Sequence, residues 1–152
     1  MNTMNTSKIS PQVETDHINK RFNEFNCSMC EQLKFRVNEI NFALKLLSRG
    51  RLDNKMKRIA LAHIEENAHM QSLLLDQLLN GYRSSEASSQ SLLGLLVEIR
   101  FVTNTLSSWS KSLHGNQLDQ STLIAAIEVM GNHARNQSEL IDRLRNWILA
   151  HN

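Results

Sequence analysis

The chain contains an internal repeat. Residues 52–80 read LDNKMKRIALAHIEENAHMQSLLLDQLLN and residues 118–146 read LDQSTLIAAIEVMGNHARNQSELIDRLRN, so the offset is 118 − 52 = 66. At this offset residues 35–80 align with residues 101–146 without a gap. The identical pairs include Phe35/Phe101, Asn38/Asn104, Lys45/Lys111, Asp53/Asp119, Ala68/Ala134, Gln71/Gln137, Ser72/Ser138, Asp76/Asp142, Leu78/Leu144 and Asn80/Asn146. Such a repeat is typical of a supersecondary unit that cannot bury its apolar face alone.

Apolar residues recur at steps of three and four in four segments, which predicts four helices. One proline, five glycines and 5% aromatic residues also favour an all-α chain. The predicted seam of the first helix is interrupted by Arg36. The four seams are Met29, Leu33, Ile40, Ala43 and Leu47; Leu61, Ile64, Ala68, Gln71, Leu75, Leu78 and Tyr82; Leu92, Leu95, Ile99, Val102, Leu106, Trp109 and Leu113; and Leu123, Ile127, Met130, Ala134, Gln137, Ile141, Leu144 and Ile148.

The predicted breaks lie near Gly50, Arg83 and Gly115. SRGRLD at 48–53 and HGNQLD at 114–119 each place a glycine after one helix and an aspartate, Asp53 or Asp119, before the next. Glycine suits a helix C-cap and aspartate an N-cap. Short connectors predict antiparallel neighbours. We therefore expect one up-down-up-down four-helix bundle at residues 13–152, made of hairpins at about 13–82 and 88–150, after a disordered tail at 1–12.

Gln71 and Gln137 stand in seam positions where apolar side chains are expected. Because they are equivalent residues of the two hairpins, we expect them to hydrogen-bond across the bundle. A polar residue in such a seam sets the register of the helices. Their predicted role is structural.

Four stretches carry a resemblance to a known family. EFNCSMCEQLKFRVNEI (24–40) and LLVEIRFVTNTL (95–106) are similar to a first-helix pattern F-L-x-x-x-S-H-E-L-R-T-P-L. NAHMQSLLLDQLL (67–79) and HARNQSELIDRL (133–144) are similar to a second-helix ending N-A-R-x-Q-x-x-L-I-x-D-L-L. Both patterns belong to the dimerisation and histidine-phosphotransfer domain of bacterial sensor histidine kinases, in which hairpins from two subunits form one bundle. The resemblance implies that this chain fuses two such hairpins.

The residues that carry the family's chemistry are missing. The acceptor histidine falls on Glu31 in the first hairpin and on Val97 in the second, and the proline falls on Arg36 and Val102. The acidic residue after the histidine survives only as Glu98. No Gly-rich phosphate loop is present. The resemblance therefore implies a non-enzymatic bundle without a cofactor, in which Glu31 is either a fixed negative charge at the acceptor position or one more solvated residue.

In the family, the surface below the acceptor histidine docks the receiver domain of a response regulator. The resemblance implies a protein partner of this kind, or a sensor kinase. Phe35 and Phe101 on that surface could instead pack in the core. An unrelated scaffold or oligomerisation bundle, and a phosphotransferase with a displaced His63, His69 or His133, are the alternatives. The residues carried over are Glu31, Lys34, Phe35, Asn38, Glu98, Arg100, Phe101 and Asn104, with Lys45, His69, Asp76, Lys111, Arg135 and Asp142 beside them.

Other constellations give weaker signals. Cys27 and Cys30 are two thiols, whereas a structural zinc site needs about four ligands. They are expected to be ordinary half-buried residues, with redox sensing as the alternative. Glu66 and His69 form one E-x-x-H, but the second hairpin has Asn132 and Arg135 there, so a di-iron set is incomplete. We expect no metal.

The formal net charge of +2 gives no reason to expect a nucleic-acid partner. No stretch is long and apolar enough for a membrane span. The polar start MNTMNTSKIS is not a secretory signal, and two cysteines are compatible with a reducing compartment. These features predict a cytoplasmic protein that is a monomer or a homo-oligomer.

Overall fold

The computed structural model describes residues 11–50, 52–83, 90–115 and 119–150. These residues form four α-helices and no strand: α1 (Pro11–Ser48), α2 (Asn54–Arg83), α3 (Gln90–Gly115) and α4 (Gln120–Ala150). The all-α prediction is confirmed. The expected disordered tail was placed too far along the chain, because α1 already begins at Pro11, a residue that suits the first turn of a helix. The rest of that tail, residues 1–10, lies outside the described residues.

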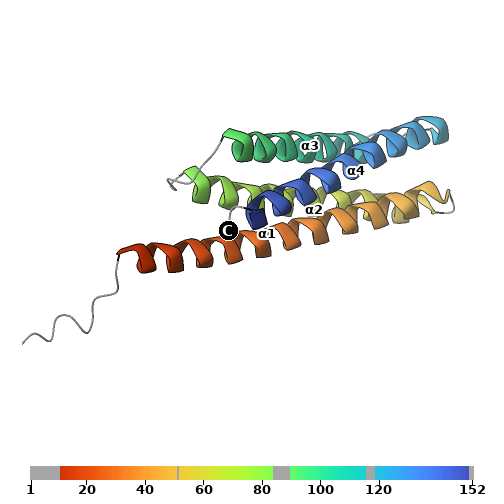
Figure 1. Cartoon of the computed structure of the whole chain (residues 1–152). Coiled ribbons are helices and arrows are strands. Elements are labelled where there is room, and N and C mark those ends of the chain that lie inside the picture. Colours follow the sequence, from red (N-terminus) through yellow and green to blue (C-terminus); the bar gives the residue numbers. More distant parts are fainter. Residues whose placement is uncertain (1–10, 51, 84–89, 116–118, 151–152) are drawn as a thin grey trace, which may run out of the picture.

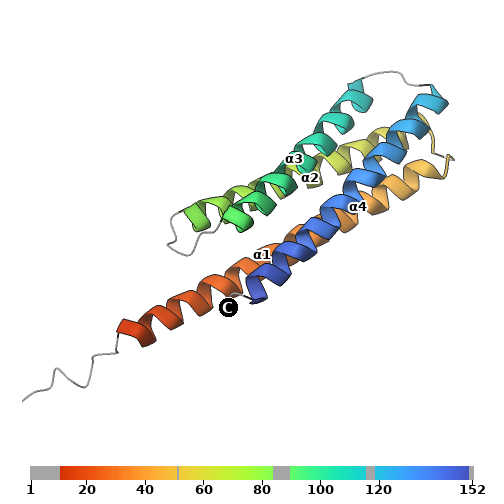
Figure 2. The ribbon, with the colours of Figure 1, turned by 45° about the horizontal axis from the view of Figure 1, so that its top comes forward.

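The helices form a ring of four neighbours. α1 packs against α2 and α4, and α3 packs against the same two helices, so that α1 and α3 lie on one diagonal and α2 and α4 on the other. The colours in Figure 1 show that each helix runs opposite to the one before it in the chain. Figure 2 shows α1 extending beyond the end of α4.

The helix boundaries follow local backbone chemistry. α1 ends at Ser48, and Gly50 takes a positive φ of 70°, a conformation that costs glycine little. Asp53 Oδ1 accepts a hydrogen bond from the Met56 N–H at 2.8 Å at the start of α2. Asp119 Oδ1 accepts one from the Thr122 N–H at 2.7 Å at the start of α4. Both aspartates thus occupy N-cap positions.

The core seams of α2 and α4 lie where the periodicity places them, since every residue predicted for these two seams is buried. In α1 the seam is not interrupted. Val37, which the prediction left out, is fully buried, and Arg36 beside it lies partly outside the core. Val37 keeps a step of four from Leu33 and a step of three to Ile40.

The predicted core seam of α3 contained too few of the buried positions. Leu96, Thr103 and Ser110 are fully buried, whereas Leu95 and Trp109 are only partly buried. A strict heptad seam contains two positions in seven. Here each helix faces two neighbours, so a third position per two turns faces inward. None of the described helices combines the length and the apolarity that a bilayer crossing requires.

Candidate functional site

Two glutamines meet at the centre of the bundle. Gln71 Nε2 donates to Gln137 Oε1 at 3.1 Å, and Gln137 Nε2 donates to Gln71 Oε1 at 3.0 Å. Both side chains are fully buried. Because α2 and α4 lie on a diagonal, this amide pair spans the bundle through its middle. Burying an amide without partners is costly, so each glutamine depends on the other.

The remaining amide hydrogens reach α1 and α3 by different routes. Gln71 Nε2 donates to the Leu33 carbonyl at 3.4 Å. Gln137 Nε2 donates to Thr103 Oγ1 at 2.5 Å, and that hydroxyl donates to the Ile99 carbonyl at 2.8 Å. Ile99 is the counterpart of Leu33 in the repeat, whereas the counterpart of Thr103 is Val37. Gln71 therefore bonds directly to the Leu33 carbonyl, whereas Gln137 reaches the equivalent Ile99 carbonyl through the Thr103 hydroxyl. No buried side-chain polar atom of the described residues lacks a hydrogen-bond partner.

Two ion pairs join the halves at equivalent positions. Lys34 Nζ on α1 lies 2.9 Å from Asp142 Oδ2 on α4, and Arg100 on α3 pairs with Asp76 on α2. In the repeat, Arg100 is the counterpart of Lys34, and Asp142 is the counterpart of Asp76. Lys34 also donates to Ser138 Oγ at 2.6 Å. Lys34 and Arg100 of the predicted docking set are therefore engaged in holding helices together.

The outer faces of α1 and α3 carry exposed aromatic side chains. Phe35 is 54% exposed and Phe101 is 69% exposed, so neither packs in the core. Asn38 and Asn104 lie exposed one turn further along each helix. We call these two stripes, Glu31–Phe35–Asn38 on α1 and Val97–Phe101–Asn104 on α3, the outer stripes. They face away from each other because α1 and α3 are diagonal.

Each outer stripe borders a hollow. On α1, a cavity of about 310 Å³ is lined by Glu31, Lys34, Phe35 and Asn38 together with residues of α4. On α3, Phe101 borders two cavities, of about 370 Å³ and about 420 Å³. Val97 and Glu98 line the first of these, and Asn104 and Trp109 line the second. Exposed aromatic side chains such as Phe35 and Phe101 are enriched in protein-docking surfaces.

The two stripes differ at their first position. Glu31 is exposed on α1, and its Oε1 lies 3.5 Å from Arg145 Nη2 on α4. The equivalent Val97 on α3 is apolar and 59% exposed. The negative charge at position 31 is therefore partly neutralised within the chain, and no such charge exists at position 97. Arg36 lies over the ring of Phe35, with its guanidinium carbon 5.4 Å from the ring centre.

The titratable residues outside these stripes do not gather into a reactive site. Cys30 is buried, and burial, followed by the charge of Cys27, raises the pKa of its thiol to about 12. A thiol with so high a pKa is a poor nucleophile. His63 Nε2 lies 3.0 Å from Glu39 Oε2, while His69 and Glu66 are exposed. Within the described residues no three or more His, Cys, Asp or Glu side chains gather as metal ligands would.

Two features of the site were not found from the sequence. Phe42 is 58% exposed and extends the stripe of α1 past Asn38; its spacing of seven from Phe35 was the available signal. A hollow also lies between α3 and α4 around Gly94 and Trp147, and it depends on helix pairing that no sequence motif reveals. The chain matches no protein-family model, no curated protein and no solved structure.

Proposed function

We propose that the chain is a non-catalytic binding module of bacterial two-component signalling. In this proposal it is an up-down-up-down bundle of two repeated hairpins that resembles a fused histidine-kinase dimerisation bundle. The two glutamines and the two ion pairs, which recur at equivalent positions of the repeat, support the repeated-hairpin arrangement. Opposite chain directions in successive helices support the topology (Figure 1).

The observation that carries the proposal is the pair of outer stripes. Phe35 and Phe101 are identical residues at equivalent positions, and both are more than half exposed. Core packing does not require an aromatic side chain at either position. An exposed aromatic beside a hollow and an asparagine has the chemistry of a binding anchor. We assign this surface to a receiver domain in the cytoplasm, with Glu31, Glu98, Asn38 and Asn104 as polar neighbours and with Lys34 and Arg100 supporting the helices beneath.

A binding role is preferred to phosphotransfer because Glu31 and Val97 occupy the acceptor positions. Neither a carboxylate nor an alkyl group forms the phosphoramidate that an imidazole forms. Incubation with a phosphorylated receiver domain should therefore leave the chain without acid-labile phosphate. Phosphohistidine at His63, His69 or His133, found by mass spectrometry, would instead support the phosphotransferase alternative.

The test of docking is a binding assay with purified receiver domains from the organism that encodes the chain. At least one domain should bind, and Phe35→Ala combined with Phe101→Ala should weaken binding by at least about tenfold, the effect typical of an interface anchor. The matched control is Ile59→Ala combined with Ile124→Ala, since these residues are 52% and 54% exposed on α2 and α4. This control should leave affinity unchanged.

The rival is a scaffold bundle with no receiver partner. It is favoured by the engagement of Lys34 and Arg100 inside the bundle, which leaves the outer stripes with few free charges to attract a partner. If no receiver domain binds, or if binding survives loss of both phenylalanines, the scaffold interpretation replaces the docking proposal. Circular dichroism of each variant checks that the fold is retained.

A further inference from the structure

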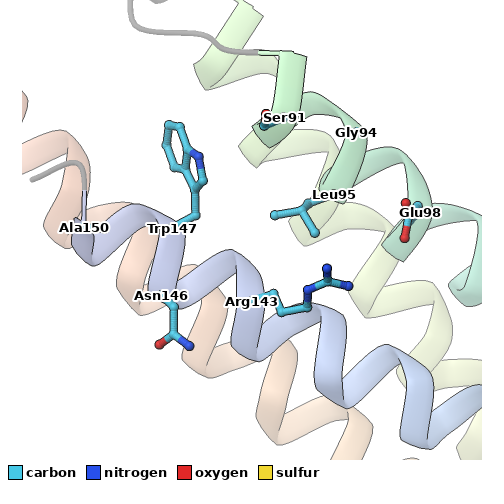
Figure 3. Close-up of a pocket in the computed structure, with 8 residues that line it drawn as sticks. All are labelled: Ser91, Gly94, Leu95, Glu98, Arg143, Asn146, Trp147 and Ala150. Carbon is cyan, nitrogen blue, oxygen red and sulfur yellow. The ribbon is translucent and has the colours of Figure 1, made fainter.

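The groove between α3 and α4 is a second surface with binding chemistry. It has a volume of about 560 Å³, and its walls come from the start of α3 and the end of α4. Figure 3 shows Leu95 reaching into the space from α3 and Trp147 and Arg143 reaching into it from α4. It lies one turn before the outer stripe of α3, with Glu98 at the boundary.

The groove is open because its α3 wall is small. A Cβ added at Gly94 would meet no atom within 4 Å. Ser91, one turn earlier, adds only a hydroxymethyl group. In the other half of the chain the sizes are exchanged: Phe25 stands where Ser91 stands, and Gly81 stands where Trp147 stands. The hollow beside Trp147 thus has no counterpart built from the same residues.

Each wall of the groove carries one charge. Glu98 is exposed on α3, and Arg143 is exposed on α4. Among the described residues neither is joined to another by an ion pair or a hydrogen bond. A negative charge on one wall and a positive charge on the other make the surface complementary to itself after a two-fold rotation.

We propose that this groove binds a second copy of the same chain. In an isologous contact, α3 of each protomer lies against α4 of its partner. Glu98 of one protomer then faces Arg143 of the other, twice, and the Leu95 and Trp147 side chains of both copies cover one another. A partner of uniform charge would leave either Glu98 or Arg143 opposite a like charge, whereas a second copy satisfies both.

The dimer should be weak. Eight residues line the groove on each protomer, whereas stable interfaces use about 20–30 residues a side. We expect a monomer–dimer equilibrium that shifts with protein concentration and weakens at high salt, because the ion pairs are exposed to solvent. The inference does not rest on the receiver-docking proposal. Since Glu98 also borders the hollow beside Phe101, dimerisation and docking on α3 would exclude each other, and the α1 stripe would stay open.

The test is a charge swap followed by mixing of the full-length variants. In Glu98→Arg, two arginines face each other at both contacts, and in Arg143→Glu two glutamates do. Each variant alone should dimerise at least about tenfold more weakly than the wild type in sedimentation equilibrium. An equimolar mixture should recover dimer, because both contacts then join opposite charges. The double variant should dimerise like the wild type.

The control swap uses Glu24→Arg and Arg58→Glu, which are exposed on α1 and α2. These variants, alone or mixed, should behave like the wild type. A wild-type chain that stays monomeric at every concentration overturns the proposal. So does a dimer that the Glu98 and Arg143 variants leave unchanged, or a mixture of the two variants that stays as monomeric as its components.

Discussion

The layer around Gln71 and Gln137 differs from the end of the bundle around Tyr82. The two halves of the chain make matching contacts in the first region and carry different residues in the second. At the centre, equivalent residues of the repeat make equivalent contacts: the glutamines bond to each other, and Lys34 and Arg100 each pair with an aspartate. At the end, Asn26 Nδ2 donates to the Tyr82 hydroxyl at 3.0 Å in a buried contact. The counterparts of Asn26 and Tyr82 at the same offset are Leu92 and Ile148, both buried and apolar.

This difference shows at which positions the two halves of the chain need the same residue. Each central glutamine is the hydrogen-bond partner of its own counterpart, so removing one amide leaves the buried amide oxygen of the other without a donor. The Asn26–Tyr82 contact joins α1 to α2 within one half, and the Leu92 and Ile148 positions lie within the other half. One of these pairs is polar and the other is apolar, so the two halves differ here in a way that the central glutamines do not.

The largest expected effect on stability follows from removing one of the two central glutamines. Gln71→Leu or Gln137→Leu should lower the free energy of unfolding by about 2 kcal/mol, because the remaining amide is buried without its partner. The double variant should recover most of that loss, since no unpaired amide remains. Urea unfolding followed by circular dichroism measures all four forms. Losses that simply add in the double variant would show that the glutamines are not coupled.

A second test uses the fact that Tyr82 is the only tyrosine in the chain. Burial, with the charge of Cys30 behind it, raises the pKa of Tyr82 to about 12. Because the tyrosine of the unfolded chain ionises near pH 10, the unfolded state loses its proton first. The stability associated with neutral Tyr82 is therefore complete below pH 10 and is lost as the pH rises toward about 12. The absorbance of folded protein should show phenolate only as the pH approaches about 12. A phenolate signal near pH 10 in folded protein would contradict the burial.

A smaller effect is expected from the polar end itself. Tyr82→Phe should destabilise the protein by about 1 kcal/mol, because it removes the hydroxyl that accepts from the buried Asn26. Adding Asn26→Leu, which copies the residue at position 92, should restore part of the stability. Thermal unfolding of the wild type, the single variant and the double variant provides the comparison. A double variant less stable than Tyr82→Phe alone would mean that the two halves are coupled here as well.

The smallest effect concerns the two ion pairs. Lys34→Met and Arg100→Met should each cost about 0.5 kcal/mol or less, because all four side chains are at least one third exposed and solvent screens their attraction. The two losses should be similar and should shrink in 1 M salt. Chemical unfolding at low and high salt tests this. A clear inequality between the variants would show that the ion pairs are equivalent in position but not in energy.

Much of the fold could be predicted because its signals are local. Asp53 and Asp119 precede helices whose first N–H groups need acceptors, and both accept them. The seams of α2 and α4 were predicted correctly because their apolar spacing is regular. The seam of α1 was predicted wrongly at Arg36 because the spacing there admits Val37 equally well, and only the pairing with α2 and α4 selects the inner residue.

The candidate site was less predictable. The sequence placed Phe35, Phe101, Lys34 and Arg100 in one set, but the structure separates exposed rings from engaged cations. Whether a side chain on a helix stays exposed depends on whether the neighbouring helix carries a residue at the same height that can pair with it. The hollow around Gly94 and Trp147 could not be predicted for the same reason. Its two walls belong to different helices, whose lining residues are far apart in the chain.

The sequence by itself determined the four helices, the N-caps of α2 and α4 and the counterpart of each glutamine. Capping and periodicity act within a few residues, and the repeat can be seen in the sequence itself. The tertiary structure alone decided that Lys34 meets Asp142, that Thr103 relays the bond from Gln137 to Ile99, and that Glu98 and Arg143 lie on opposite walls of one groove. These contacts join different helices. They follow from which helices become neighbours when four apolar faces are buried together, and no short stretch of sequence contains that information.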